Sequence, residues 1–174
     1  MQLAGPIASE SGLWTAFTAK AELVGAAVLR EATETAASGL LAEAGDALTR
    51  TASVERRFPA VAAQLPSRSP DAEPAREVVS AAEFAVAETG SVALNEPAAD
   101  RRACFLADRL WLLVPADQVV PTLDQALERM ADLIRAGAHH PLLMTGPSRT
   151  ADIERTLTVG VHGPRSVVII IVGA

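Results

Sequence analysis

The sequence predicts an α/β fold in three layers, with helices on both sides of a mostly parallel sheet that also carries a β-hairpin. Two segments in the second half, "RLWLLVP" (109–115) and "SVVIIIV" (166–172), are apolar at nearly every position. Strands of this kind have both faces covered, as in parallel sheets that lie between helices. A strong helical pattern separates the two segments, and parallel neighbours need such a connection.

The first half of the chain alternates helical and strand-like patterns. Ser11 is placed to cap a helix with Trp14 and Phe17 on one face, and Gly25 is a natural end for it. The next expected elements are a strand at 26–32, a helix at about 35–44, a short strand in "DALTRTA" (46–52) and a helix that Ser53 caps. Pro59 is poorly placed inside that last helix.

The second half has clearer patterns. "FAVAETGSVALNE" (84–96) alternates, and a two-residue connection, Thr89-Gly90, favours a tight hairpin. "PTLDQALERMADLIRAG" (121–137) is the strongest helix: Thr122 and Gln125 form a capping box. Its expected apolar face consists of Leu123, Ala126, Leu127, Met130, Leu133 and Ile134. "PLLMT" (141–145) predicts a buried strand, and residues 148–159 predict a helix before the last strand.

Length and composition indicate a single domain. The chain has 174 residues, of which 49% are hydrophobic and 21% charged. Residues 1–12 are expected to form a flexible arm and residues 13–174 one domain, with a proline-rich loop at about 66–77.

Charge and cysteine content exclude several classes of function. A net charge of -6 argues against nucleic acid as a partner. The longest apolar run, 167–172, is too short to cross a bilayer, and the first residues lack the features of a signal peptide, so we expect a cytoplasmic protein. Cys104 is the single cysteine, which excludes an internal disulfide, a self-contained iron–sulfur cluster and a cysteine-rich zinc site. Neither a structural metal nor a bound cofactor is expected, because His139 and His140 are adjacent and no dinucleotide or P-loop motif occurs.

The segment "TGPSRTADIE" (145–154) is the first candidate site. If Ser148 caps a helix, the free amides beside it and the positive charge of Arg149 form a pocket for a carboxylate or phosphate. The alternative is purely structural, with Ser148 as the cap and with Asp152 and Glu154 complementing the helix dipole. His162, in "GVHGP" (160–164), is expected near Asp152 or Glu154, either as an acid or base or as a structural residue.

Three segments together resemble one known family. "AEFAVAETGSVAL", "TGPSRTADIE" and "GVHGP" occur in the order and spacing of the LUD domain, the family of lactate-utilisation protein C. Ser91 stands where threonine is usual in that family. The resemblance implies a fold like that of the ribose-5-phosphate isomerase, CoA-transferase and formyltetrahydrofolate cyclo-ligase group.

The resemblance also implies a function and a set of site residues. It indicates an accessory part in oxidising L-lactate to pyruvate, together with iron–sulfur partner proteins. The alternatives are an autonomous enzyme of the CoA-transferase or cyclo-ligase kind, with Glu88 as nucleophile or base, and a regulatory domain that binds a small anionic metabolite. The expected ligand-binding residues are Thr89, Gly90, Arg102, Thr145, Gly146, Ser148, Arg149, Asp152, Glu154 and His162. We expect residues 88–90 to lie close in space to residues 145–149, because ligand crevices gather turns at strand ends.

Overall fold

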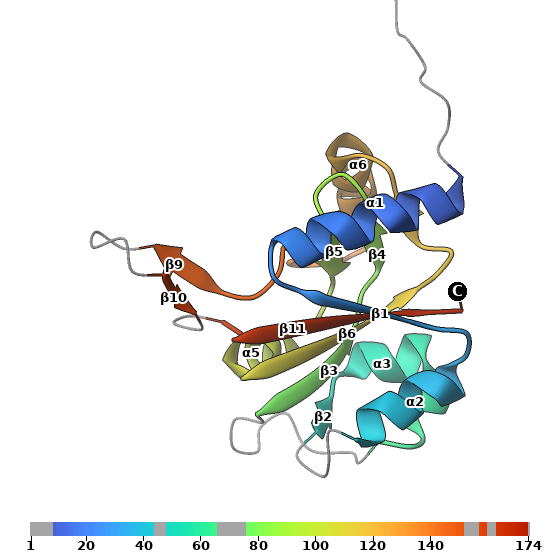
Figure 1. Ribbon diagram of the computed structural model, residues 1–174, viewed down its shortest axis with the longest axis vertical. Coiled ribbons are helices and arrows are strands. Elements are labelled where there is room, and N and C mark those ends of the chain that lie inside the picture. Colours follow the sequence, from blue (N-terminus) through green and yellow to red (C-terminus); the bar gives the residue numbers. More distant parts are fainter. Residues whose placement is uncertain (1–8, 44–47, 66–75, 152–156, 160–162, 174) are drawn as a thin grey trace, which may run out of the picture.

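A five-stranded parallel sheet lies at the centre of the computed structural model, which describes residues 9–43, 48–65, 76–151, 157–159 and 163–173 (Figure 1). Each neighbouring pair of its strands runs in the same direction. In spatial order the strands are β1 (Ala27–Glu31), β11 (Ser166–Val172), β6 (Arg109–Pro115), β3 (Glu77–Ala81) and β2 (Leu48–Arg50). The predicted α/β class with a mostly parallel sheet is therefore confirmed.

Both faces of this sheet are covered. Along β6, Leu110, Leu112 and Val114 pack on one side, whereas Trp111 and Leu113 pack on the other. The second side meets three helices: α2 (Glu34–Ala42), α3 (Ala52–Arg57) and α4 (Pro59–Ala62). The first side meets α1 (Glu10–Leu23), α5 (Ala98–Leu106) and a second sheet. Water is excluded from both faces, which explains why β6 after Arg109 and β11 after Ser166 are apolar.

The predicted hairpin is present, but it belongs to the second sheet. In spatial order this sheet consists of β7 (Val119–Val120), β4 (Phe84–Val86), β5 (Ser91–Leu94) and β8 (Leu142–Met144). The segment predicted as a buried strand, 141–145, thus contributes β8, a half-buried strand at the edge of this mixed sheet and not of the parallel one. The other face of the hairpin packs on α6 (Leu123–Arg135).

The connection in the hairpin is longer than the predicted two residues. Residues 87–90 link β4 to β5, and the N–H of Gly90 donates to the carbonyl oxygen of Val86 over 2.9 Å. The N–H groups of Ala87 and Glu88 donate to the carbonyl oxygens of Val120 and Pro121, so this part of the chain follows β7 instead of pairing with β5. Because Ala87 and Glu88 are hydrogen-bonded to residues outside the hairpin, they lengthen the connection between β4 and β5.

Several helix ends differ from the prediction. Ser9, not Ser11, accepts a hydrogen bond at the start of α1, from the N–H of Gly12. Pro59 does not interrupt a helix, because it stands at the first position of α4, where no N–H is needed. Thr122 caps α6 as predicted, but Leu127 and Ile134 of its expected apolar face are 53% and 57% exposed. The buried side of α6 is thus narrower than the sequence pattern indicates.

The largest correction concerns residues 148–159, which do not form the predicted helix. They contain two antiparallel strands, β9 (Arg149–Ala151) and β10 (Leu157–Val159), in which Thr150 lies opposite Thr158. β-branched residues favour strands over helices, and Thr150, Thr158 and Val159 outweigh the helical signals in the same segment. Consequently there is no helix N-terminus at Ser148.

β3 and α5 are among the elements that have no counterpart in the predictions. β3 begins directly after the proline-rich segment. Because the predicted loop extended to residue 77, the start of this strand was assigned to the loop. The helix α5 begins after Pro97 without a side-chain cap, so the usual sequence signal for a helix start is missing.

Candidate functional site

Two of the motif segments line one groove of about 320 Å³ beside β8. The segment "TGPSRTADIE" contributes Thr145, Gly146 and Ser148, and the segment "GVHGP" contributes Gly163 and Pro164. The N–H of Ser148 donates to the carbonyl oxygen of Pro164 over 2.9 Å, and a Cβ atom at Gly163 would lie 3.0 Å from that of Ser148. The structure therefore brings these two segments together.

The chemistry of this groove differs from the expected anion pocket. Apart from the motif residues, the described side chains that line it are apolar: Phe105, Leu142, Leu143 and Met144. The side chains of Thr145 and Ser148 supply hydroxyl groups, and none of the described lining residues is charged. With no helix N-terminus at Ser148, the free amides that were expected to bind an anion at this turn are not present in that form, and the side chain of Arg149 lies outside the described part of the structure.

A chain of hydroxyl groups joins the hairpin turn to the same segment. The Thr89 hydroxyl donates to Ser91 Oγ over 2.8 Å, and Ser91 Oγ and Thr145 Oγ1 are hydrogen-bonded at 2.6 Å. Antiparallel pairing of β5 with β8 sets this contact, because it places Val92 opposite Met144. Thr89 and Thr145 are therefore neighbours in space although 56 residues separate them.

Glycine is required where both turns meet the end of α1. Gly90 has φ +69°, and a Cβ atom there would lie 2.4 Å from the backbone nitrogen of Ala21. Gly146 has φ +72°, and its Cβ atom would lie 2.8 Å from the carbonyl oxygen of Val24. The absence of a side chain thus allows both turns to pack directly on the last turn of α1.

Among the other predicted site residues, Glu88 and Arg102 do not line the groove. The exposed carboxylate of Glu88 accepts a hydrogen bond over 2.7 Å from the N–H of Leu123, at the start of α6. Arg102 lies on the exposed side of α5. Arg149 belongs to β9, and only its backbone is described. Asp152, Glu154 and His162 lie outside the described residues, and so does the predicted contact of His162 with either acid.

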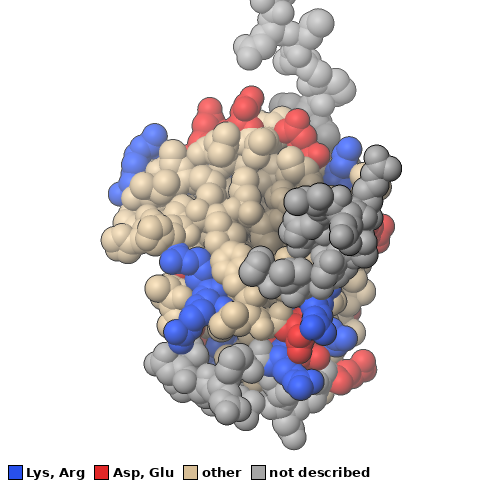
Figure 2. Space-filling view, turned by 90° about the vertical axis from the view of Figure 1, so that its left-hand side faces the viewer, with Lys and Arg blue, Asp and Glu red and all other residues tan. Residues whose placement is uncertain are grey.

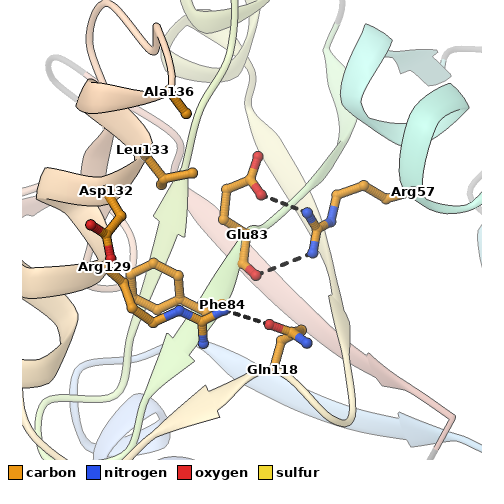
Figure 3. Close-up of a pocket in the computed structure, with 8 residues that line it drawn as sticks. All are labelled: Arg57, Glu83, Phe84, Gln118, Arg129, Asp132, Leu133 and Ala136. Atoms are coloured by element: carbon orange, nitrogen blue, oxygen red, sulfur yellow. Dashed lines mark hydrogen bonds and ion pairs between the residues drawn. The ribbon is translucent and has the colours of Figure 1, made fainter.

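A second cavity, of about 400 Å³, lies where β3 and β6 end (Figure 3). Its lining residues come from α3, from the β3–β4 and β6–β7 connections and from α6: Arg57, Glu83, Phe84, Gln118, Arg129, Asp132, Leu133 and Ala136. We call this cavity the arginine cleft. Ligands of open α/β sheets collect at the carboxyl ends of the strands, which is where the arginine cleft lies.

Specific contacts hold the two arginines of the cleft. Arg57 Nη1 lies 2.5 Å from Glu83 Oε2, and Arg57 Nη2 donates to the carbonyl oxygen of Glu83 over 3.2 Å. Arg129 donates to Gln118 Oε1 over 2.6 Å and stacks on the ring of Phe84, 4.7 Å from its centroid. Both guanidinium groups are therefore oriented by the fold.

A buried polar cluster fixes the helix that carries Arg57. Glu96 is only 6% exposed, and its Oε1 accepts hydrogen bonds from Ser53, on α3, and from Ser80, on β3, the latter over 2.6 Å. Ser53 Oγ also accepts from the N–H of Ala81, and Asp100 accepts from the N–H of Ala52. The cluster thereby joins α3, β3 and α5.

Burial dominates the electrostatics of this cluster. It raises the pKa of Glu96 above the ordinary value of 4.5, and the hydroxyl donors only partly offset the effect. Within the described part of the chain, Oε2 of Glu96 has no hydrogen-bond partner. Burial also raises the pKa of the neighbouring Cys104 thiol, which is 1% exposed, so this thiol stays protonated at neutral pH.

Sequence reasoning did not identify the residues of the arginine cleft. Arg57, Gln118 and Arg129 come from separate parts of the chain and belong to no short motif, and Glu83 stands at the start of the segment "AEFAVAETGSVAL" without being singled out there. The one available signal was positional, because Glu83 and Gln118 follow closely on two strands of a parallel sheet. In the regions that the structure describes, no group of three or more His, Cys, Asp and Glu side chains could hold a metal ion, and no helix is long and apolar enough to cross a membrane.

The parallel sheet, the mixed sheet and the motif turns between them define one class of α/β protein. A crystal structure of a DUF162 family protein from Deinococcus radiodurans has this fold: the TM-score is 0.66 at 24% identity, and the match covers 95% of this chain and 99% of that one. The family model of the LUD domain matches residues 67–172, which is more than half of the chain. The chain therefore belongs to the LUD domain family, as its motifs predicted.

Relatives named lactate utilization protein C are similar to more than half of the chain. The protein of Geobacillus thermodenitrificans is 39% identical over 107 residues, which are 58% of this chain and 44% of the relative. The protein of Oceanobacillus iheyensis is 35% identical over 105 residues, 58% of this chain and 45% of the relative. The chain thus spans less than half the length of these curated relatives.

We predict that Gly90→Ala lowers the free energy of unfolding by at least about 2 kcal/mol, because the added Cβ atom meets the backbone of α1 and the backbone φ is positive. Gly39→Ala is the control. Gly39 lies in α2 with nothing within 4 Å of the added atom, so this variant should gain about 0.5 to 1 kcal/mol. Urea denaturation measures both, and equal effects would contradict the packing of Gly90 on α1.

We predict that Glu96→Gln removes a pH dependence of stability. The pKa of Glu96 is raised in the folded protein, so its contribution to stability is complete below pH 4.5 and is lost as pH rises through the folded-state pKa. The free energy of unfolding of the wild type, relative to the variant, should therefore fall with pH. Denaturation at intervals between about pH 4 and pH 8 measures this.

The matched control is Glu22→Gln, which removes an exposed carboxylate of α1. Its difference from the wild type should not follow the profile of Glu96→Gln. A difference between wild type and Glu96→Gln that stays constant with pH would show that the folded state does not raise the pKa of Glu96.

Proposed function

We propose that the chain takes part in lactate utilisation, as an accessory component of L-lactate oxidation to pyruvate that acts with iron–sulfur partner proteins. Membership of the LUD family and the names of the curated relatives support the metabolic role. The observation that carries the proposal is that two of the three motif segments line a single groove and that the third is hydrogen-bonded to one of them through Ser91 and Thr145.

The chemistry of the reaction supports a division of labour. Oxidation of L-lactate to pyruvate releases two electrons and two protons, so a redox group must accept the electrons. Iron–sulfur clusters are commonly held by four cysteine thiolates, whereas Cys104 is the single cysteine of these 174 residues and is buried. The proposal therefore assigns the cluster to partner proteins.

The surface around the groove suits contact with another protein. Phe105, which lines the groove, is 38% exposed, and its neighbour Leu106 is 57% exposed. In Figure 2 the middle of the upper half carries no charged side chains, whereas Asp and Glu lie along its top and Lys or Arg at its sides. Exposed apolar side chains that gather on one surface are typical of protein–protein interaction sites.

The test uses cells that grow on L-lactate and lack the chromosomal gene. The wild-type protein should restore growth and co-purify with iron–sulfur proteins. Phe105→Asp should abolish both, because a buried carboxylate opposes an apolar contact. Leu127→Asp, on the exposed side of α6 and outside the groove, is the control and should behave like the wild type.

Each result bears on the proposal. Normal growth on L-lactate without the gene would overturn the metabolic role. Equal behaviour of Phe105→Asp and Leu127→Asp, with both proteins folded by circular dichroism, would overturn the assignment of the groove as the contact surface.

A further inference from the structure

The arginine cleft has the position and size of a site for a small molecule. β3 and β6 are parallel neighbours, and the chain leaves them through Glu83 and Gln118, so both side chains arrive at the same edge of the sheet. A volume of about 400 Å³ is at the lower end of the range for ligand pockets. A ligand that fits this cleft is therefore a small metabolite.

The cleft contains one cation whose charge is not balanced by a carboxylate. Glu83 is paired with Arg57, and Asp132 is paired with Arg135 of the same helix. Arg129, in contrast, contacts a neutral amide and an aromatic ring, and none of the described residues forms an ion pair with it. Its contact with Gln118 occupies one of five N–H donors, so the others are available to an anion.

A second guanidinium group, that of Arg57, lines the cleft. The side chain of Arg57 is 26% exposed, and its Nη groups bind Glu83. Its Nε–H is buried, and within the described residues it has no hydrogen-bond partner. The two Nη contacts with Glu83 hold the guanidinium group in place in the lining of the cleft.

The remaining wall of the cleft combines polar acceptors with apolar surface. The carboxylate of Glu83 and the amide oxygen of Gln118 accept hydrogen bonds, and both are held in place by the arginines. Leu133 and Ala136 of α6 complete the lining beside Phe84 (Figure 3). The cleft thus offers donors for a carboxylate, an acceptor for a hydroxyl group and a surface for a methyl group.

We infer that the arginine cleft binds a small 2-hydroxycarboxylate of the L-lactate type. Arg129 binds the carboxylate, because guanidinium groups pair with carboxylates through two parallel hydrogen bonds. Arg57 adds a second positive charge to the lining of the same cleft. Glu83 or Gln118 accepts the hydrogen bond of the 2-hydroxyl group, and Leu133 and Ala136 contact the methyl group. This inference rests on the proposed function, since it names the metabolite that the protein handles.

Isothermal titration calorimetry of the purified chain with sodium L-lactate tests the inference. Wild-type protein should bind, and Arg129→Gln should bind at least about tenfold more weakly, because it loses the charged partner of the carboxylate. Arg135→Gln is the control: it removes an exposed arginine of the same helix, outside the cleft, and should not change the affinity.

A second variant and two ligand analogues make the result specific. Ala136→Phe leaves every charge in place but narrows the cleft, so it should also weaken binding. Lactamide, which lacks the carboxylate, and propionate, which lacks the hydroxyl group, should each bind more weakly than L-lactate.

Three results would overturn the inference. The first is that the wild type does not bind L-lactate in the millimolar range. The others are that Arg129→Gln, shown to be folded by circular dichroism, binds L-lactate as tightly as the wild type does, or that the wild type binds propionate as tightly as L-lactate. Its failure is distinguishable from failure of the proposed function. If growth on L-lactate requires the protein but L-lactate does not bind, the inference alone fails. If L-lactate binds but growth does not require the protein, the proposed function fails.

Discussion

The buried carboxyl group of Glu96 organises the carboxyl edge of the parallel sheet. It accepts hydrogen bonds from Ser53 of α3 and Ser80 of β3. The helix α3 has six residues, too few to be stable by itself, so contacts of this kind must hold it against the sheet. Arg57 follows Ser53 by one helical turn, and the contact at Glu96 therefore also determines where the guanidinium group of Arg57 lies.

Burial of this acid has a cost that the protein reduces in two ways. An isolated carboxylate is strongly disfavoured in the interior, and burial accordingly raises the pKa of Glu96 and favours its neutral form. Hydroxyl donors from both neighbouring elements satisfy one of its oxygens. The hydrogen bonds of Glu96 thus fix the position of α3 on the sheet. An apolar residue at the same place would supply contact area but no directional bond.

The two cavities separate two kinds of chemistry on one domain. The groove beside β8 is apolar, contains hydroxyl groups and depends on glycine at the turns that pack on α1. The arginine cleft is charged and depends on the contacts of α3 and α6 with the ends of β3 and β6. In the proposed account, the groove faces a protein partner and the cleft holds the metabolite. Of the residues that line the cleft, only Glu83 and Phe84 belong to a motif segment that identifies the family.

The sequence predicts the parts of this structure in which a local pattern coincides with tertiary burial. β6 and β11 are recognisable because both of their faces are covered, and α6 because Thr122 marks its start. The hairpin turn was predicted too short, since the backbone of Ala87 and Glu88 pairs with residues beside β7, more than 30 positions away. Residues 149–151 and 157–159 pair as strands where a helix was expected, because the helical signals are local and the pairing is not.

The candidate sites show the same limit. Thr145, Gly146 and Ser148 could be found because they share a short motif, whereas Arg57 and Arg129 stand in ordinary helical sequence and become neighbours of one cleft only through the fold. Glu96 resembles a surface acid in the sequence, and nothing near it indicates that Ser53 and Ser80 will surround it.

The central claim, that the fold presents Arg57 and Arg129 to a small carboxylate, is tested most directly by the NMR signals of the arginine Nε–H groups. Spectra of Arg57→Lys and Arg129→Lys assign the two signals. The account predicts that both signals shift progressively as L-lactate is added, while those of the exposed Arg135 and Arg165 do not. Signals of Arg57 and Arg129 that stay in place, or that move no more than those of the exposed arginines, would contradict it.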